Sequence, residues 1–136
     1  MHITLEADYA LRIVDTLARQ DVRMEAKAIA EKACVTLRFS LKILRKLVAA
    51  GIVRSYKGSQ GGYEIAKPLD EITVYDILET IEGPLTLNRC ILADHPCNRV
   101  PDKKCPYHHI FERTSERLKT ELSSITIASL VQNRKQ

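Results

Sequence analysis

The stretch "TLRFSLKILRKLVAAGIVRSYKGSQGGYEIAKP", residues 36–68, combines a helical period, a glycine-rich turn and a run of cations. Thr36 can cap a helix, and Gly51 is placed to end it as a left-handed residue. Two short extended runs follow, 52–56 and 63–66, and the glycines between them allow the tight turn of a hairpin. The stretch therefore predicts a helix followed by a two-stranded β-hairpin.

Two helical patterns come before this stretch. Apolar residues recur with helical spacing between Thr4 and Arg19, and a shorter helix is expected over residues 26–33. Three helices followed by a glycine-rich hairpin is the order of elements in a winged helix-turn-helix. In that fold the third helix enters the major groove of DNA and the wing contacts the backbone or the minor groove. The expected fold class is therefore mostly α, with a small β-hairpin as the wing.

The second half of the chain predicts two more helices joined by a polar loop. One is expected over residues 72–83 and a longer one over 108–125. The longer helix has an apolar seam too wide to remain in water, so we expect it to pair with the same helix of a second copy in a homodimer. The seam residues are Ile110, Phe111, Leu118, Leu122 and Ile125.

These elements divide the chain into three expected parts. Residues 1–84 form a winged helix-turn-helix DNA-binding domain. Residues 85–107 form a cysteine-containing loop that is the candidate cluster-binding segment. Residues 108–136 form the dimerisation helix and a C-terminal tail.

The charge is distributed unevenly, although the formal net charge is only +4. No acidic residue occurs between Glu31 and Glu64, whereas the same segment holds seven lysines and arginines. Such a segment favours a polyanion as its partner. A solvated basic face would explain the charge but not the order of the elements. We therefore expect the segment to bind double-stranded DNA through Arg38, Lys42, Arg45, Lys46, Arg54 and Lys57.

Enzymes and membrane proteins are disfavoured by the absence of their motifs. The sequence has no P-loop, no G-x-G-x-x-G, no H-E-x-x-H and no nucleophile elbow. It begins without the pattern of a signal peptide, and no apolar run approaches the roughly twenty residues of a membrane span. We therefore expect a cytoplasmic protein that is not an enzyme and has no membrane partner, and whose thiols stay reduced.

Three of the four cysteines are concentrated in "NRCILADHPCNRVPDKKCPYHH", residues 88–109. Thiolates are soft ligands that suit iron–sulfur clusters and zinc, but the closely spaced C-x₂₋₄-C pairs of zinc sites are absent. Cys90, Cys97 and Cys105 are therefore candidate ligands of an iron–sulfur cluster. A thiol sensor without a cluster, a zinc site and no role at all remain open alternatives. Cys34, outside this loop, is expected to be a small buried residue.

Several segments together resemble a known family. They are "DYALRIV", "LRKLVAAGIV", "YKGSQGGYEIAKP" and "ITVYDILETIEGP", followed by the cysteine cluster. In these segments the chain resembles the Rrf2 family of bacterial transcription regulators, which includes iron–sulfur sensors of the IscR and NsrR types. The resemblance covers residues 2–131, and its most specific parts are the glycine-rich wing and the three cysteines before the long helix.

The resemblance implies a homodimer on a pseudo-palindromic operator, controlled by an iron–sulfur cluster, with [2Fe–2S] favoured over [4Fe–4S]. It implies base contacts by Thr36 and Arg38. It also implies that His108 completes the cluster site of the three loop cysteines, with Asp8 of the partner subunit as the alternative ligand. The expected function is sequence-specific regulation of transcription in response to redox, iron or nitric oxide status. A cluster-free thiol-based or small-molecule-responsive repressor of the same family is the alternative.

Overall fold

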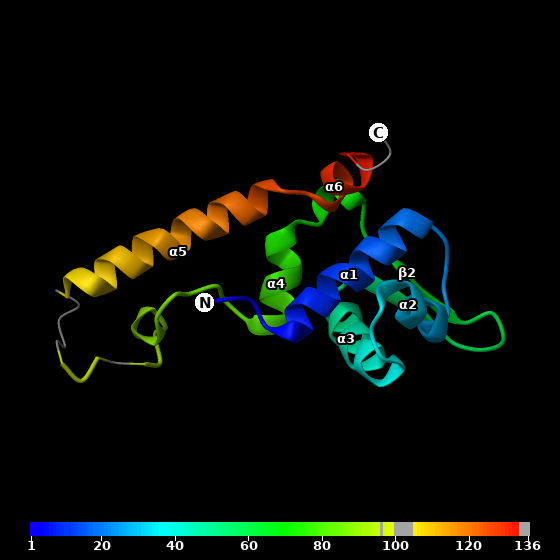
Figure 1. Ribbon diagram of the computed structural model, residues 1–136, viewed down its shortest axis with the longest axis horizontal. Coiled ribbons are helices and arrows are strands. Elements are labelled where there is room, and N and C mark those ends of the chain that lie inside the picture. The colour runs from blue at the N-terminus through cyan, green and yellow to red at the C-terminus, as the bar shows by residue number, and fades with distance from the viewer. Residues whose placement is uncertain (96, 100–104, 134–136) are drawn as a thin grey trace.

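The computed structural model describes residues 1–95, 97–99 and 105–133. Within these residues the chain forms six α-helices, two short 3₁₀ helices and one two-stranded antiparallel sheet (Figure 1). The expected fold class, mostly helical with a hairpin wing, is confirmed. The elements are α1 (Leu5–Gln20), α2 (Ala26–Ala33), α3 (Leu37–Ala49), β1 (Val53–Tyr56), β2 (Gly62–Ile65), η1 (Leu69–Glu71), α4 (Val74–Glu82), η2 (Arg89–Ile91), α5 (Pro106–Ser124) and α6 (Ile127–Asn133).

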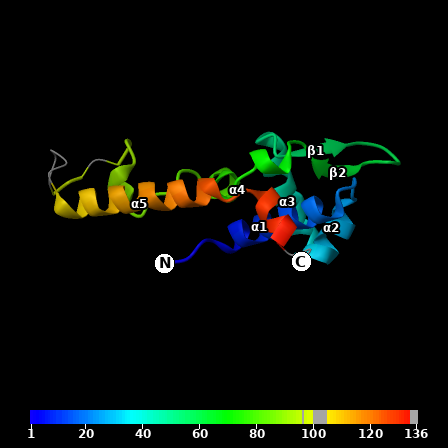
Figure 2. The ribbon, with the colours of Figure 1, turned by 90° about the horizontal axis from the view of Figure 1, so that it is seen from above.

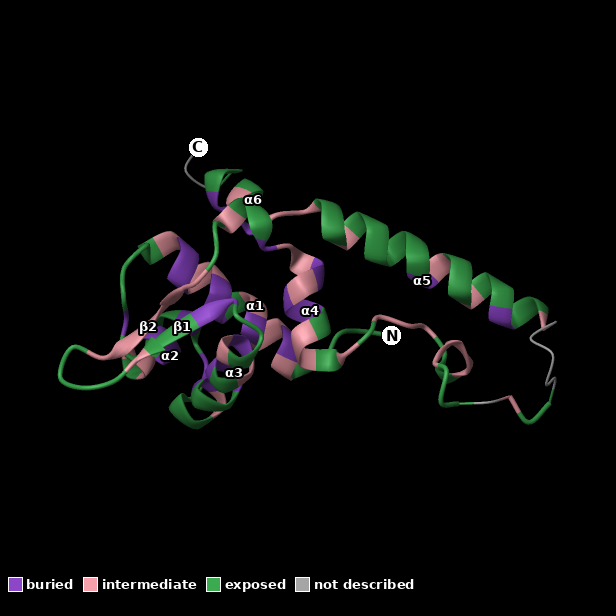
Figure 3. Ribbon diagram, turned by 180° about the vertical axis from the view of Figure 1, so that it is seen from behind, coloured by how far each residue is buried: buried purple, intermediate pink, exposed green. Residues whose placement is uncertain are grey.

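The hydrophobic core lies in the body formed by α1 to α4 and the hairpin, where most buried residues are found (Figure 3). Apolar residues at helical spacing give each helix one buried side, so the helices can share a single core. The largest fully buried side chains come from several elements: Ile13, Leu17, Ile29, Ile43, Leu44, Leu47, Ile72 and Ile77. The hairpin contributes Val53 to the same core.

Helix α3 begins and ends at the residues that the sequence predicts. The Oγ1 of Thr36 accepts a hydrogen bond of 3.3 Å from the Phe39 N–H, which satisfies one of the free amides of the first turn. Gly51 has a φ of +75° after the end of the helix. Leu37 in the first turn has a side chain that is 44% exposed. Thr36 and Arg38 beside it are exposed as well, so the first turn extends beyond the core.

The wing is held by a third backbone segment that the sequence analysis did not anticipate. Strands β1 and β2 pair in register, with Val53 opposite Ile65. In addition, Met24 and Tyr63 exchange two backbone hydrogen bonds, of 2.9 and 2.8 Å. The connection between α1 and α2 therefore pairs with the outer edge of β2 and joins the wing to the body.

Helix α5 extends away from the body, as the two perpendicular views show (Figures 1 and 2). Its C-terminal end returns to the body through an isolated bridge between Thr73 and Thr126. Helix α6 then packs Ile127 and Val131 into the core. The Oγ1 of Thr126 accepts from the Ser129 N–H at 3.2 Å and so caps this last helix.

The residues of α5 are mostly exposed, and its buried side chains are His108 and Ser115. Both lie on the face that meets the loop after α4, because the Ser115 hydroxyl accepts from the Leu87 N–H at 3.0 Å. Two seam residues, Ile110 and Leu118, are 47% and 37% exposed. The chain by itself therefore leaves part of the predicted seam uncovered.

Gly62 and Gly58 allow a matched test of how the wing joins the body. Both have a positive φ, but a Cβ at Gly62 would lie 2.6 Å from the Met24 carbonyl oxygen, whereas Gly58 has open space. We expect Gly62→Ala to lower the free energy of unfolding further than Gly58→Ala does, by about 1–3 kcal/mol for forced overpacking. Urea denaturation followed by circular dichroism measures both variants. Equal losses would contradict the close approach of Met24.

Candidate nucleic-acid interface and cysteine site

The first turns of α3 form an exposed basic surface. Arg38, Lys42 and Arg45 are exposed, and together with Leu37 and Leu41 they surround a shallow hollow on the outer side of the helix. An arrangement of cations along an exposed helix suits the phosphates that flank the major groove. Arg38, Lys42 and Arg45 thus share one accessible surface, whereas Lys46, the other predicted cationic contact on α3, is half-buried and does not border the hollow.

Two lysines of α3 are paired with an acid from α1. The Nζ of Lys46 lies 2.6 Å from one carboxylate oxygen of Glu6, and the Nζ of Lys42 lies 3.4 Å from the other. The hydrogen bond from Lys46 is the main reason that the pKa of Glu6 is below its ordinary value. The Glu6 side chain is 19% exposed, and the hydrogen bonds from the two lysines outweigh the effect of this burial and favour the charged carboxylate. To contact a DNA phosphate, either lysine would therefore have to give up its ion pair with the Glu6 carboxylate.

The wing presents a second group of cations. Lys57 is exposed at the turn after β1. Arg54 on β1 is exposed and lies 3.4 Å from the Tyr56 hydroxyl and 3.8 Å from Glu64. The Tyr56 hydroxyl in turn donates a short hydrogen bond to the Glu64 carboxylate. Arg54 is therefore part of a surface network on the hairpin.

Arg23 fixes the wing from the connection before α2. Its guanidinium lies 3.3 Å from the centre of the Tyr56 ring, and its Nη1 donates to the Gln60 carbonyl at 3.1 Å. Stacking of a guanidinium on an aromatic ring combines dispersion with a cation–π attraction. Sequence reasoning missed Arg23, because no local pattern indicates that residue 23 lies against residue 56.

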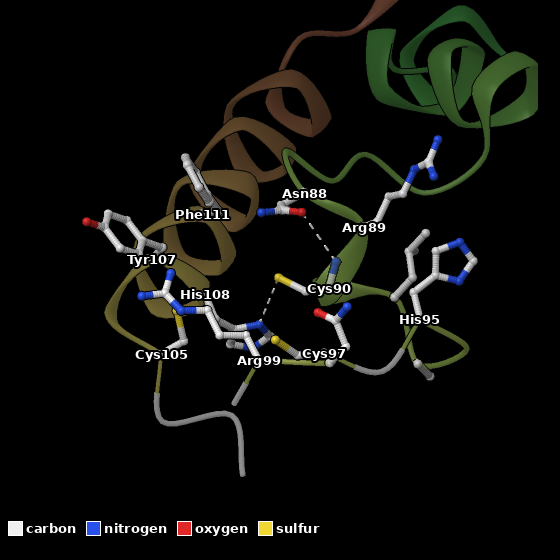
Figure 4. A pocket seen from close by; sticks show the side chains of 13 residues that line it. Asn88, Arg89, Cys90, His95, Cys97, Arg99, Cys105, Tyr107, His108 and Phe111 are labelled. Carbon is white, nitrogen blue, oxygen red and sulfur yellow. Dashed lines mark hydrogen bonds between the residues drawn. The ribbon is translucent and has the colours of Figure 1, made fainter. Parts of the chain in front are cut away.

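The cysteine loop and the start of α5 enclose a hollow of about 1010 Å³ (Figure 4). Cys90, Cys97 and Cys105 are half-buried in its lining, and His108 is 6% exposed. The Sγ of Cys90 lies 3.4 Å from Nδ1 of His108. The other ring nitrogen of His108 lies 3.9 Å from a Glu112 oxygen. The structure therefore brings the four predicted cluster ligands to one hollow.

The type of these donors fits an iron–sulfur cluster, since clusters are held by thiolates and by imidazoles that replace them. Cys105 precedes the first turn of α5 and His108 follows within that turn, so the two come from one short segment. Within residues 1–95, 97–99 and 105–133, however, no group of three His, Cys, Asp or Glu side chains is close enough to hold a metal ion. Residues 96 and 100–104 of the loop lie outside the described residues.

Two other residues singled out in the sequence lie away from this hollow. Asp8 is half-buried on α1 and forms an ion pair of 2.9 Å with Arg12. Cys34 was expected to be buried, and this prediction is wrong because the residue is exposed. It ends α2 in a left-handed conformation, with a φ of 56°, so it follows the last turn of the helix rather than its buried side.

Comparison with known proteins gives the family of the chain. The family model of Rrf2, described as an iron-dependent transcriptional regulator, matches residues 3–133. The chain belongs to the Rrf2 family. The resemblance to this family is thereby confirmed. As an Rrf2-family member, the chain is a transcriptional regulator with a DNA-binding fold and not an enzyme.

Individual Rrf2-type relatives agree with this assignment. A protein of Aquifex aeolicus named as an HTH-type transcriptional regulator is 31% identical over 124 residues, covering 90% of this chain and 86% of that protein. The structure of CymR (YrzC), the global cysteine regulator of B. subtilis, has a TM-score of 0.76 and 27% identity over 98% of both chains. T. potens IscR has a TM-score of 0.78 at 23% identity, covering 98% of this chain and 88% of that chain, and it shares the fold.

No helix that the structure describes in this Rrf2-family chain is both long and apolar enough to cross a membrane.

Sequence reasoning also missed the pairing of Glu6 with α3. The available signal was the spacing of Lys42 and Lys46, because residues four apart share one face of a helix. Which acid they meet depends on the packing of α1 on α3.

Replacing Glu6 with Gln tests whether its carboxylate competes with DNA. We expect Glu6→Gln to raise affinity for duplex DNA about two- to fivefold at low salt, a gain of about 0.5–1 kcal/mol typical of a partly exposed ion pair. Glu121→Gln, an exposed site on α5, changes the net charge equally and serves as control. Fluorescence anisotropy measures both, and a lower affinity for Glu6→Gln would contradict competition.

The same pair predicts a dependence of stability on pH. Because the folded pKa of Glu6 is lowered from 4.5, the ion pairs contribute fully to the free energy of unfolding above about pH 4.5. Their contribution is lost as the pH falls through the lowered pKa. Urea denaturation between pH 7 and pH 3 should show a smaller loss of stability for Glu6→Gln than for the unchanged protein.

Proposed function

We propose that this chain is a homodimeric, sequence-specific regulator of transcription in the cytoplasm, whose operator binding is controlled by an iron–sulfur cluster. One observation carries the proposal: Cys90, Cys97, Cys105 and His108 line a single hollow beside the helix that leads away from a basic winged body. A donor set of this kind has no evident structural need in a chain with its own core. It suits a sensor connected to a DNA-binding domain.

In the proposed complex, α3 lies in the major groove and the wing lies on the backbone or in the minor groove. Thr36 and Arg38, at the exposed start of α3, contact bases, and Arg38 can donate two hydrogen bonds to guanine. Phosphates are contacted by Lys42, Arg45, Lys46, Arg54 and Lys57. These phosphate contacts hold the protein on DNA of any sequence, and salt weakens them.

A homodimer through α5 would provide two such units. The helix spans roughly 28 Å at about 1.5 Å per residue. Tyr107, Ile110 and Leu118 on it are 59%, 47% and 37% exposed. This stripe lies next to the face that packs on the loop. Burying it against a second α5 about a two-fold axis would direct two α3 helices to the two halves of a pseudo-palindromic site.

Leu118→Glu tests the dimer. A charge at Leu118 would have to be buried in the interface without a partner, so we expect monomers and a loss of at least about tenfold in DNA affinity, since each 1.4 kcal/mol is tenfold. Thr120→Glu places the same charge two residues away on the exposed side and should leave the dimer intact. Light scattering gives the mass of each variant. If the Leu118→Glu protein is still a dimer, Leu118 does not lie in the dimer interface and the proposed pairing of α5 is wrong.

The cluster would be held by the thiolates of Cys90, Cys97 and Cys105 and by the imidazole of His108. A bound cluster supplies a redox-active, chemically labile centre. The chain's own contacts join the loop that follows α4 to α5. Cys90 meets His108 of α5 at 3.4 Å, and Leu87 donates to Ser115 at 3.0 Å. Ordering the loop would thus fix the end of α4 against α5, and releasing it would shift the populations of the two states.

The ligand set is tested by reconstitution without oxygen, followed by visible absorption. We expect Cys97→Ala to be colourless and His108→Ala to hold a labile or spectrally altered cluster, because imidazole can protonate and leave more easily than thiolate. Asp8→Ala should resemble the unchanged protein. Cys34→Ala, an exposed cysteine elsewhere, is the control. A normal His108→Ala together with a bleached Asp8→Ala would assign the fourth ligand to the carboxylate.

A cluster-free thiol regulator is the second candidate. Two observations favour it. Cys90 contacts His108 directly, and among the described residues no three His, Cys, Asp or Glu side chains are close enough to hold a metal ion. The similarity to CymR, described as a global cysteine regulator, also supports it. Protein that takes up no iron under any condition, but whose DNA affinity changes on thiol oxidation, would favour this candidate over the cluster.

A further inference from the structure

Two leucines on the outer side of α3 have no covering in this subunit. Leu37 and Leu41 are 44% and 38% exposed. They are four residues apart, so they follow one another on the same face of the helix. The buried side of α3 is formed by other residues, namely Ser40, Ile43, Leu44 and Leu47. The two leucines therefore contribute little to the core.

The surroundings of the pair indicate what covers it. Leu37 and Leu41 border a hollow of about 780 Å³ whose exposed cations are Arg38, Lys42 and Arg45. The covering surface must be strongly negative, yet it must also present small apolar groups between its charges. The major groove of DNA meets both conditions, because phosphates line its edges and the C5-methyl of thymine is the apolar group on its floor.

The first turn of α3 is also held rigidly, as a reading surface requires. Thr36 caps it at the Phe39 N–H. The Phe39 ring meets Tyr9 of α1 edge to face, with centroids 5.4 Å apart. Leu37 and Leu41 are thus presented on a fixed backbone, so little conformational entropy is lost when their side chains meet a base edge.

We propose that Leu37 and Leu41 determine specificity by contacting thymine methyl groups in each operator half-site. The proposal rests on the DNA-binding function proposed above, and it adds that thymine is a base that the protein recognises. The two leucines read thymine, whereas the cations beside them contact phosphates and guanine. Specificity at these positions then depends on a methyl group rather than on a hydrogen bond.

The test removes that methyl group alone. Duplexes that bind the full-length protein are first selected from a random-sequence library, and each thymine of the selected site is then replaced with deoxyuridine. We expect one or more positions per half-site at which the replacement weakens binding about fourfold, the effect of one methyl-sized group leaving water. In Leu41→Ala or Leu37→Ala, the loss at the corresponding position should disappear.

Leu130→Ala is the matched control, because this leucine of α6 is 40% exposed and lies outside α3. It should keep the full deoxyuridine effect. A protein that selects a defined site but tolerates deoxyuridine at every position overturns the proposal and leaves the DNA-binding function standing. A protein that selects no DNA at all overturns both. If Leu41→Ala instead changes the oligomeric mass in light scattering, a second copy covers the leucines, and thymine reading is wrong.

Discussion

The return of the chain at Thr126 is the constraint on which the rest of the molecule depends. The Val74 N–H donates to the Ile125 carbonyl at 2.9 Å, and the Ile127 N–H donates to the Ile72 carbonyl at 2.8 Å. These bonds join the start of α4 to the end of α5, and α6 then enters the core. The segment that leaves the body after α4 and returns before α6 is therefore joined to the body where it returns. Without this closure, α5 would have no fixed direction relative to the DNA-binding body.

A second set of contacts connects the same region to the basic surface. The Thr4 N–H donates to a Glu82 oxygen at 2.7 Å, which joins the start of α1 to the end of α4. Two residues further along the chain, Glu6 holds Lys42 and Lys46 of α3. The start of α1 thus contacts both the helix that leads into the cysteine loop and the helix proposed to bind DNA.

Local signals in the sequence were sufficient for most of the fold. Thr36 and Gly51 bound α3 as expected, because caps and left-handed glycines act within a few residues. The hairpin strands differ from the expected ones by one residue at their ends. The long helix begins at Pro106 rather than at 108, since proline is well suited to a first turn. The resemblance to the Rrf2 family was also readable from the sequence alone.

Contacts between distant segments could not be predicted in the same way. The pairing of Met24 with Tyr63 and of Glu6 with α3 depends on tertiary packing, which leaves no local period. The exposure of Leu37 could not be predicted from local sequence either, because helical spacing does not show where along a helix the core ends. For the cysteine site, the sequence indicated the four residues at the hollow. It could not indicate that Ser115 and Leu87 would hold the loop on α5.

The backbone pairing of Met24 with Tyr63 has a mechanical consequence. It makes the hairpin the outer part of a three-segment ribbon, whose inner segment is the covalent connection between α1 and α2. The backbone pairing reaches Tyr56 and Gly62, so the turn that carries Lys57 extends beyond the paired part of the ribbon. The base of the wing is therefore held at two places, by its own two strands and by the backbone that connects α1 to α2.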